Sequence, residues 1–202
     1  MYKQLNDNDE LTEKAGDPFE PTRIDFKFQD AVLNRYYNVI MTQEKMMEGS
    51  LERFESNVSI VKSEEKVYTF HNDPINLACH ATITPVIEDY LGKKLFPTHC
   101  FVRVYPKGST LGEHYDKATS EYAITYCHSS EVPWAINMNK KSLEAEQGSC
   151  ILYKGNETLH GRVDPAPCTV LQSFYFWVEK GGEYDHWRYN KDPLYKKIYQ
   201  QI

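Results

Sequence analysis

The hydrophobic pattern of this chain changes after Leu95, and that change limits the folds open to it. From there to residue 179, six short segments are rich in Val, Ile, Tyr, Phe, Trp and Thr. They are THCFVRVYPKG, EYAITYCHS, PWAINMN, GSCILYKGN, ETLHGRV and CTVLQSFYFWVE, and Gly, Pro, Asn and Ser residues separate them. Short apolar or alternating runs bounded by turn residues predict strands. Strands at near-regular spacing after a helical region predict a helix-backed β-sandwich or jelly roll.

A helical layer is expected to precede this sheet. Between residues 29 and 47, apolar side chains recur at intervals of three and four, which is the pattern of an amphipathic helix. A second helix is expected to begin at Pro74, with Asp73 as its N-cap, and to end at Gly92. Pro85 lies inside this second segment and is expected to kink the helix or split it in two.

The length of 202 residues suits a single domain. Residues 1–22 are polar and lack periodicity, which predicts an N-terminal arm or loop. Residues 23–202 are expected to form one domain that is mostly β with flanking helices. Its predicted parts are helical support over 28–92, a jelly-roll core over 96–180, and a C-terminal extension over 181–202 with a short helix at PLYKKIYQQI.

Composition excludes several partners and locations. The net charge is -6, and basic residues form no stripe that could follow a phosphate backbone, so nucleic acid is not an expected partner. No apolar run approaches the roughly 20 residues of a membrane span, and the polar N-terminus does not resemble a signal peptide. The five cysteines form no C-x-x-C pair, which disfavours a disulfide framework. We therefore expect a soluble protein of the cytoplasm of a bacterial, phage-infected or other host cell.

His114 and Asp116 form an H-x-D pair within GEHYDKATSEYAITY. Residues i and i+2 of a strand point to the same face, so both side chains can reach one ion. The pair also suits a solvated turn, and a metal site needs a third ligand. His160 lies 44 residues after Asp116, where a double-stranded β-helix would bring it to the same end of the barrel. Two imidazoles and one carboxylate occupy one face of an octahedral Fe(II) and leave three positions for a 2-oxo acid and O2.

Arg162 follows His160 by two residues and so shares its strand face. The two lie about 6.6 Å apart along the strand, at roughly 3.3 Å per residue. A 2-oxoglutarate molecule chelated to iron at one end extends its far carboxylate by a similar distance. A buried arginine there would pair with that carboxylate in a bidentate manner. A surface salt bridge is the alternative for Arg162.

A family resemblance extends this pattern. FPTHCFVRVYPKGSTLGEHYDKATSEYAITYCHSSEVPWAINM resembles the PTYxxxRxYxxGxxLxxHxDRPSCExSxT and WPI stretches of a group of small Fe(II)/2-oxoglutarate oxygenases. This group is related to prolyl 4-hydroxylases and is common in marine bacteria and their phages. LYKGNETLHGR and QSFYFWVEKGGEYDHWRYNKD are similar to its LYxGxxxxHWRE and QxFxHYVxxxGxYxxxxxDKR stretches. The similarity runs from about residue 70 to residue 193.

The resemblance implies a double-stranded β-helix (a cupin-like jelly roll) that uses Fe(II), 2-oxoglutarate and O2. It implies His114, Asp116 and His160 as iron ligands and Arg162 as the partner of the 2-oxoglutarate carboxylate. Tyr105 resembles the tyrosine that prolyl hydroxylases place near the cosubstrate, although a half-buried strand tyrosine is equally consistent. The group's DRPSCE and HWRE read DKATSE and HGRV here, so substrate choice does not carry over. CTVLQSFYFW also lacks the basic residue that ordinary prolyl hydroxylases place some ten residues beyond the distal histidine.

The substrate pocket and the reaction stay open at this point. Trp134 could line the pocket or belong to the core, and Arg103 could point inward with Tyr105 or outward into a salt bridge. Asp116 favours hydroxylation, because related halogenases lack this carboxylate. The predicted function is hydroxylation of a prolyl, amino-acid-like or other small substrate, free or within a peptide. The alternatives are a jelly-roll ligand-binding protein without redox activity and another metal-dependent cupin enzyme.

Overall fold

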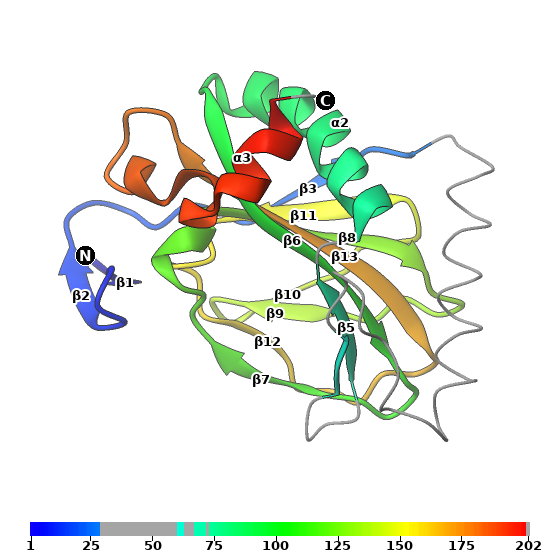
Figure 1. The fold of residues 1–202 in the computed structure, drawn as a ribbon. Coiled ribbons are helices and arrows are strands. Elements are labelled where there is room, and N and C mark those ends of the chain that lie inside the picture. Colours follow the sequence, from blue (N-terminus) through cyan, green and yellow to red (C-terminus); the bar gives the residue numbers. More distant parts are fainter. Residues whose placement is uncertain (29–59, 63–66, 72, 201–202) are drawn as a thin grey trace.

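Two antiparallel sheets face each other, and helices cover the outer face of the larger one (Figure 1). The computed structural model describes residues 1–28, 60–62, 67–71 and 73–200. The large sheet contains, in spatial order, β3 (Thr22–Asp25), β11 (Ser149–Tyr153), β8 (Tyr122–Ser129), β13 (Val170–Glu179), β6 (Leu95–Tyr105), β5 (Tyr68–His71) and β4 (Ile60–Lys62). The small sheet contains β10 (Lys141–Leu143), β9 (Ile136–Met138), β12 (His160–Arg162) and β7 (Leu111–His114). This arrangement is the predicted jelly roll.

Each of the six predicted segments contains a strand, namely β6, β8, β9, β11, β12 and β13. The central strands read as continuous apolar runs because both faces of the large sheet are buried. In β13, Leu171, Tyr175 and Trp177 join the core on the helical side of the sheet. Phe174 and Phe176, with the opposite parity, join a second core between the two sheets. The space between the sheets is called the barrel interior below.

Helix α2 (Pro74–Leu91) has the predicted ends. Oδ1 of Asp73 accepts hydrogen bonds from the backbone N–H groups of Ile75 and Asn76, at 3.0 and 2.9 Å. Gly92 adopts the left-handed conformation, with φ of 64°. The expected effect of Pro85 was a kink or a split, and the split does not occur, because Pro74–Leu91 forms one helix with Pro85 inside it.

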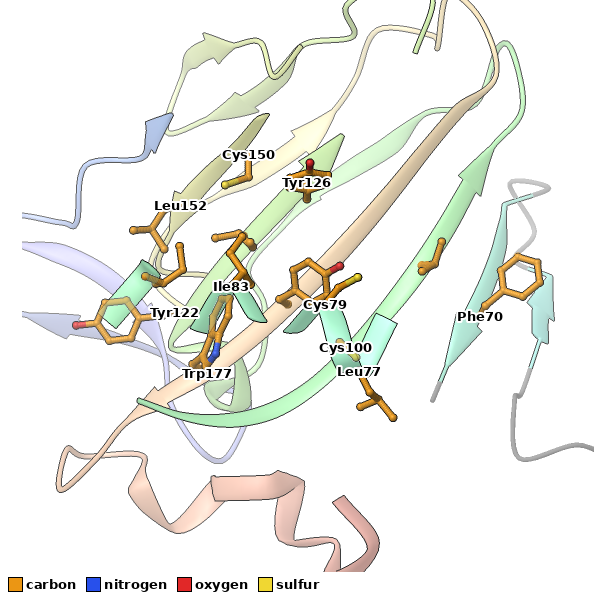
Figure 2. Close-up of a cluster of buried hydrophobic side chains, with 14 of the residues drawn as sticks. Phe70, Leu77, Cys79, Ile83, Cys100, Tyr122, Tyr126, Cys150, Leu152 and Trp177 are labelled. Atoms are coloured by element: carbon orange, nitrogen blue, oxygen red, sulfur yellow. The ribbon is translucent and has the colours of Figure 1, made fainter. Parts of the chain in front are cut away.

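Packing explains why the helix continues past its proline. Ile83 and Ile87 lie on either side of Pro85, and both are completely buried. Figure 2 shows Ile83 near Trp177 of β13 in the core between α2 and the large sheet. Burial of each such side chain contributes about 1.5–3 kcal/mol, which offsets the hydrogen bond that proline removes.

The N-terminal segment is more ordered than its sequence indicates. β1 (Tyr2–Leu5) and β2 (Leu11–Lys14) pair as an antiparallel hairpin, and β3 joins the large sheet beside β11. The expectation of an arm or loop over residues 1–22 is corrected accordingly. Tertiary hydrogen bonds hold the hairpin, because Gln4 donates to the hydroxyl of Tyr184 at 2.5 Å and the indole of Trp187 donates to Asp7 at 2.6 Å. Because these contacts are polar, they give the sequence no hydrophobic periodicity from which the hairpin could be predicted.

The remaining elements complete the chain. A 3-10 turn, η1 (Ala118–Ser120), follows the H-x-D segment, and another, η2 (Asp185–Lys191), leads to α3 (Pro193–Tyr199), which is the predicted C-terminal helix. The helix predicted over residues 29–47 lies outside the described residues. Within the described part of the chain, every helix is too short or too polar to cross a bilayer.

Candidate metal centre

His114, Asp116 and His160 come together at one end of the small sheet. His114 ends β7 and His160 begins β12, and the two residues are directly opposite each other in the antiparallel pair. Asp116 follows β7 by two residues. One ligand atom from each of the three lies within 4.8 Å of the others. The structure thus brings together three residues that are 46 positions apart at most in the sequence.

Both imidazoles are held in the same way. Nδ1 of His114 lies 2.8 Å from the carbonyl oxygen of Gly112, and Nδ1 of His160 lies 2.8 Å from that of Thr158. A carbonyl only accepts, so each Nδ1 donates and each neutral ring keeps its lone pair on Nε2. These Nε2 atoms lie 3.5 and 3.7 Å from the two oxygens of Asp116. Backbone carbonyls of this kind orient histidine ligands in metal sites.

The charges suit a cation between the three side chains. Burial raises the pKa of Asp116, but attraction to the protonated form of His160 and a hydrogen bond from that of His114 outweigh it, so the pKa of this carboxyl is lowered. The hydrogen bond to Asp116 raises the pKa of His114, whereas burial lowers that of His160. Oδ2 of Asp116 is buried without a hydrogen-bond donor among the described residues. An ionised carboxylate with an unsatisfied buried oxygen, beside two Nε2 lone pairs, fits a bound metal ion.

Gly155 lies directly against Asp116 and helps to fix its position. Its carbonyl accepts the backbone N–H of Asp116 at 2.9 Å, and its own N–H donates to the carbonyl of Ser120 at 3.0 Å. A side chain on Gly155 would contact the Asp116 carboxylate directly. In the sequence this glycine belongs only to a turn and a shared motif, because the approach of the two segments is purely tertiary.

Arg162 is a buried cation without a carboxylate. The side chain is 1% exposed, and among the described residues no acidic group lies within ion-pair distance of it. One terminal nitrogen donates to the carbonyl of Trp134, and the other donates to Oε1 of Gln172 at 2.9 Å. Nε has no partner in the described structure. A surface salt bridge is therefore excluded, and burial lowers the pKa of Arg162 to about 10.

Trp134 packs on this guanidinium, and Tyr105 packs on Trp134. Trp134 is buried, with its ring 4.6 Å from the guanidinium carbon of Arg162, and its indole N–H donates to the carbonyl of Asp164 at 2.8 Å. Tyr105 is completely buried and packs edge-on against Trp134, with 5.2 Å between ring centroids. The ring of Trp134 thus covers one face of the Arg162 guanidinium.

Gln172 and Tyr153 belong to the same interior, and neither was predicted from the sequence as a site residue. Gln172 is buried on β13 and also accepts a hydrogen bond from Thr125 at 2.5 Å. Tyr153 packs against His160 with 4.8 Å between ring centroids. A signal for Gln172 does exist, because it shares the parity of Phe174 and Phe176 in VLQSFYF and so had to face the barrel interior.

The fold is shared with solved oxygenase structures. No protein-family model matches the sequence, and no curated protein is significantly similar to it. A member of the 2OG-Fe(II) oxygenase family from Burkholderia pseudomallei aligns with a TM-score of 0.57 and 14% identity over 78% of this chain and 84% of that one. A prolyl-4-hydroxylase from Pseudomonas putida aligns at 0.54 and 16% over 77% and 91%. A prolyl hydroxylase from Trichoplax adhaerens, in complex with a hypoxia inducible factor peptide fragment, aligns at 0.52 and 13% over 82% and 86%. These similarities confirm the predicted jelly roll.

Proposed function

We propose that this protein is an Fe(II)- and 2-oxoglutarate-dependent dioxygenase that hydroxylates a prolyl, amino-acid-like or other small substrate. One observation carries the proposal. Two oriented Nε2 atoms and a partly buried carboxylate converge on one point, and a buried arginine without a counter-ion among the described residues lies on the strand of the second histidine. The fold shared with oxygenases supports this reading.

The donor set fits Fe(II) better than a structural metal. Structural zinc sites use four sulfur or nitrogen ligands and are closed, whereas two histidines and one carboxylate leave positions open for other ligands. A catalytic zinc site could use the same three residues. Arg162 favours the oxygenase reading, because a buried guanidinium matches a dicarboxylate that reaches from the metal into the barrel interior.

The residues around Arg162 define a place for the cosubstrate. Gln172 lies on β13, in the segment where ordinary prolyl hydroxylases carry their basic residue, and it accepts a hydrogen bond from Arg162. Arg162 thus brings a positive charge to this strand from β12. The hydroxyl of Tyr105 accepts a hydrogen bond from Arg103 at 3.2 Å, so its own proton remains available to a carboxylate. We assign the far carboxylate of 2-oxoglutarate to Arg162 and Tyr105.

Each group then has a defined task. His114, Asp116 and His160 hold the metal, while Arg162 and Tyr105 orient the cosubstrate. When bound, iron and 2-oxoglutarate use O2 to oxidise a C–H bond, with succinate and CO2 as coproducts. The buried aromatic walls, including Tyr153 and Trp134, exclude water from the region that holds the cosubstrate.

An anaerobic titration with Fe(II) and 2-oxoglutarate tests the proposal. Formation of the ternary complex should produce a weak visible charge-transfer band, and Asp116→Ala should abolish it. A jelly-roll binding protein would produce no band. A cupin enzyme of another class would bind a different metal and would not respond to 2-oxoglutarate. Absence of the band in the wild-type protein at saturating concentrations of both would refute the proposed function.

A further inference from the structure

The barrel interior contains a second arginine. Arg103 lies on β6, opposite Gln172 of β13 on one side and Thr69 of β5 on the other. Its Nε donates to the hydroxyl of Thr69 at 3.1 Å, and one terminal nitrogen donates to the hydroxyl of Tyr105 at 3.2 Å. These bonds turn the side chain inward and fix its plane, so the outward salt bridge considered for Arg103 does not form.

Arg103 has no acidic partner within ion-pair distance in the part of the chain that the structure describes. Its second terminal nitrogen also makes no hydrogen bond to a described residue. Burial lowers the pKa of Arg103, but Tyr105 and Asp116 outweigh that effect, so the pKa of this guanidinium is raised. A fixed cation with a spare donor thus lies in the same barrel interior as Arg162, to which Tyr105 and Trp134 connect it.

An aromatic surface lies next to this cation. The guanidinium carbon is 4.8 Å from the ring centroid of Phe101 and 5.7 Å from that of Phe174. Phe101 contacts Phe176 with 5.4 Å between centroids, and Phe176 stacks on His99 at 4.3 Å. The surface therefore combines one positive charge with several flat apolar groups.

The barrel interior contains two arginines, but 2-oxoglutarate requires only one of them as a carboxylate partner. 2-Oxoglutarate binds a metal through its 2-oxo group and one carboxylate, which leaves a single carboxylate for the protein. Arg162 is the more deeply buried of the two, at 1% exposure, and lies on the strand of His160. Arg103 is partly buried and remains for a second anion. A buried cation is stabilised by a ligand that supplies its counter-charge.

We infer that Arg103 binds a carboxylate of the substrate, and that the substrate is a free acid with an apolar ring or chain rather than an internal residue of a peptide. This inference rests on the proposed function and narrows its substrate class. The carboxylate would pair with the guanidinium, and the apolar part would lie on Phe101 and its neighbours, within reach of the metal. An internal peptide residue lacks this carboxylate and would leave the arginine unpaired.

The test compares free acids with their primary amides. L-Proline, L-pipecolate and phenylacetate, each beside its amide, are titrated calorimetrically into the anaerobic Fe(II)-loaded protein, with and without 2-oxoglutarate. At least one acid should bind, and its amide should bind roughly 30-fold more weakly or worse, as expected when a charged partner is lost. Arg103→Gln should weaken binding of that acid by a similar factor, and Arg103→Lys should restore part of it.

Matched variants separate the two arginines. Arg23 is a surface arginine paired with Asp25 and Glu146, and Arg23→Gln should leave acid binding unchanged. Arg103→Gln should weaken 2-oxoglutarate binding far less than Arg162→Gln does. Circular dichroism of each variant checks that the fold is retained.

Several results would overturn the inference. The first is that an acid and its amide bind with equal affinity. The second is that Arg103→Gln binds the acid as tightly as the wild type does. The third is that none of the acids binds. Loss of 2-oxoglutarate affinity in Arg103→Gln but not in Arg162→Gln would assign Arg103 to the cosubstrate instead. If the wild type binds an acid through Arg103 but never binds 2-oxoglutarate, the carboxylate site stands and the proposed function fails.

Discussion

A Cβ atom on Gly155 would lie 2.5 Å from Oδ2 of Asp116 and 2.9 Å from its Cβ. A Cβ atom does not approach non-bonded atoms this closely, so one of the two segments would have to move. The carboxylate therefore occupies its position only because residue 155 has no side chain.

Gly155→Ala should weaken Fe(II) binding although all three candidate ligands remain. The displaced carboxylate should reduce metal affinity by roughly 10- to 100-fold, the usual effect of disturbing the support of a ligand. Gly112→Ala is the matched control, because its methyl group would meet nothing within 4 Å and its carbonyl is retained. Anaerobic Fe(II) titration measures both variants. Wild-type affinity in Gly155→Ala would contradict the assignment of Asp116.

His114→Ala, Asp116→Ala and His160→Ala should each abolish Fe(II)-dependent turnover of 2-oxoglutarate. A set of three ligands has no spare member, whereas polar residues at the end of a sheet add little to the core. Succinate formation measures turnover, and circular dichroism follows the fold. Turnover at the wild-type rate in any one of these variants would refute the triad.

Arg162→Ala should weaken 2-oxoglutarate binding by roughly 30-fold or more, because it removes a desolvated partner worth about 2–5 kcal/mol. Arg162→Lys should recover only part of the loss, since an ammonium group cannot form the planar fork. Fe(II) affinity should be nearly unchanged in both. The measurement is anaerobic cosubstrate titration, and equal affinities in all three proteins would assign the carboxylate elsewhere.

Acid should destabilise the protein in part through His80. This side chain is completely buried against Tyr175 and Trp177, and burial lowers its pKa well below 6.5. Below about pH 6.5 this histidine binds a proton in the unfolded chain but not in the folded protein. The free energy of unfolding therefore decreases as the pH is lowered, by up to about 1.4 kcal/mol per pH unit. Urea unfolding at pH 7.5 and 5.5 should show a smaller loss for His80→Gln than for the wild type. Identical losses would show that His80 does not contribute.

Asp73→Ala should destabilise the protein by about 1 kcal/mol, because two N–H groups at the start of α2 lose their acceptor. Asp73→Ser keeps a capping oxygen and should retain most of that stability. Urea unfolding at pH 7 measures the difference. Equal stability of the alanine and serine variants would indicate that the cap makes no net contribution.

Local signals in the sequence were sufficient for the long elements. The strands around Val102 and Phe174 carry enough apolar residues to be recognised alone, and Asp73 and Gly92 mark both ends of α2. β7 was missed because LGEH contains a single apolar residue, and it becomes a strand only through its pairing with β12. β10 and the N-terminal hairpin were also missed, because their sequences have no strand pattern and tertiary contacts determine their structure.

The candidate site divides in the same way. Strand parity and spacing marked His114, Asp116 and His160 as candidates, but the H-x-D pair also suited a solvated turn, and only the family resemblance implied that the three are iron ligands. Gly155 could not be selected, since its importance lies in a contact between distant segments. For Arg103, parity placed it with Tyr105, but the choice between inward and outward needed the position of Thr69.

β7 is an edge strand of the small sheet, hydrogen-bonded only to β12 among the described strands. Since His114 ends β7 and His160 begins β12, a shared metal ion would cross-link an otherwise weakly held edge to its neighbour. Metal affinity and the free energy for opening this edge are then linked quantities, because an ion that requires both strands stabilises their pairing by mass action. Removal of the metal should accelerate amide hydrogen exchange along residues 111–114 while the central strands of the large sheet stay protected.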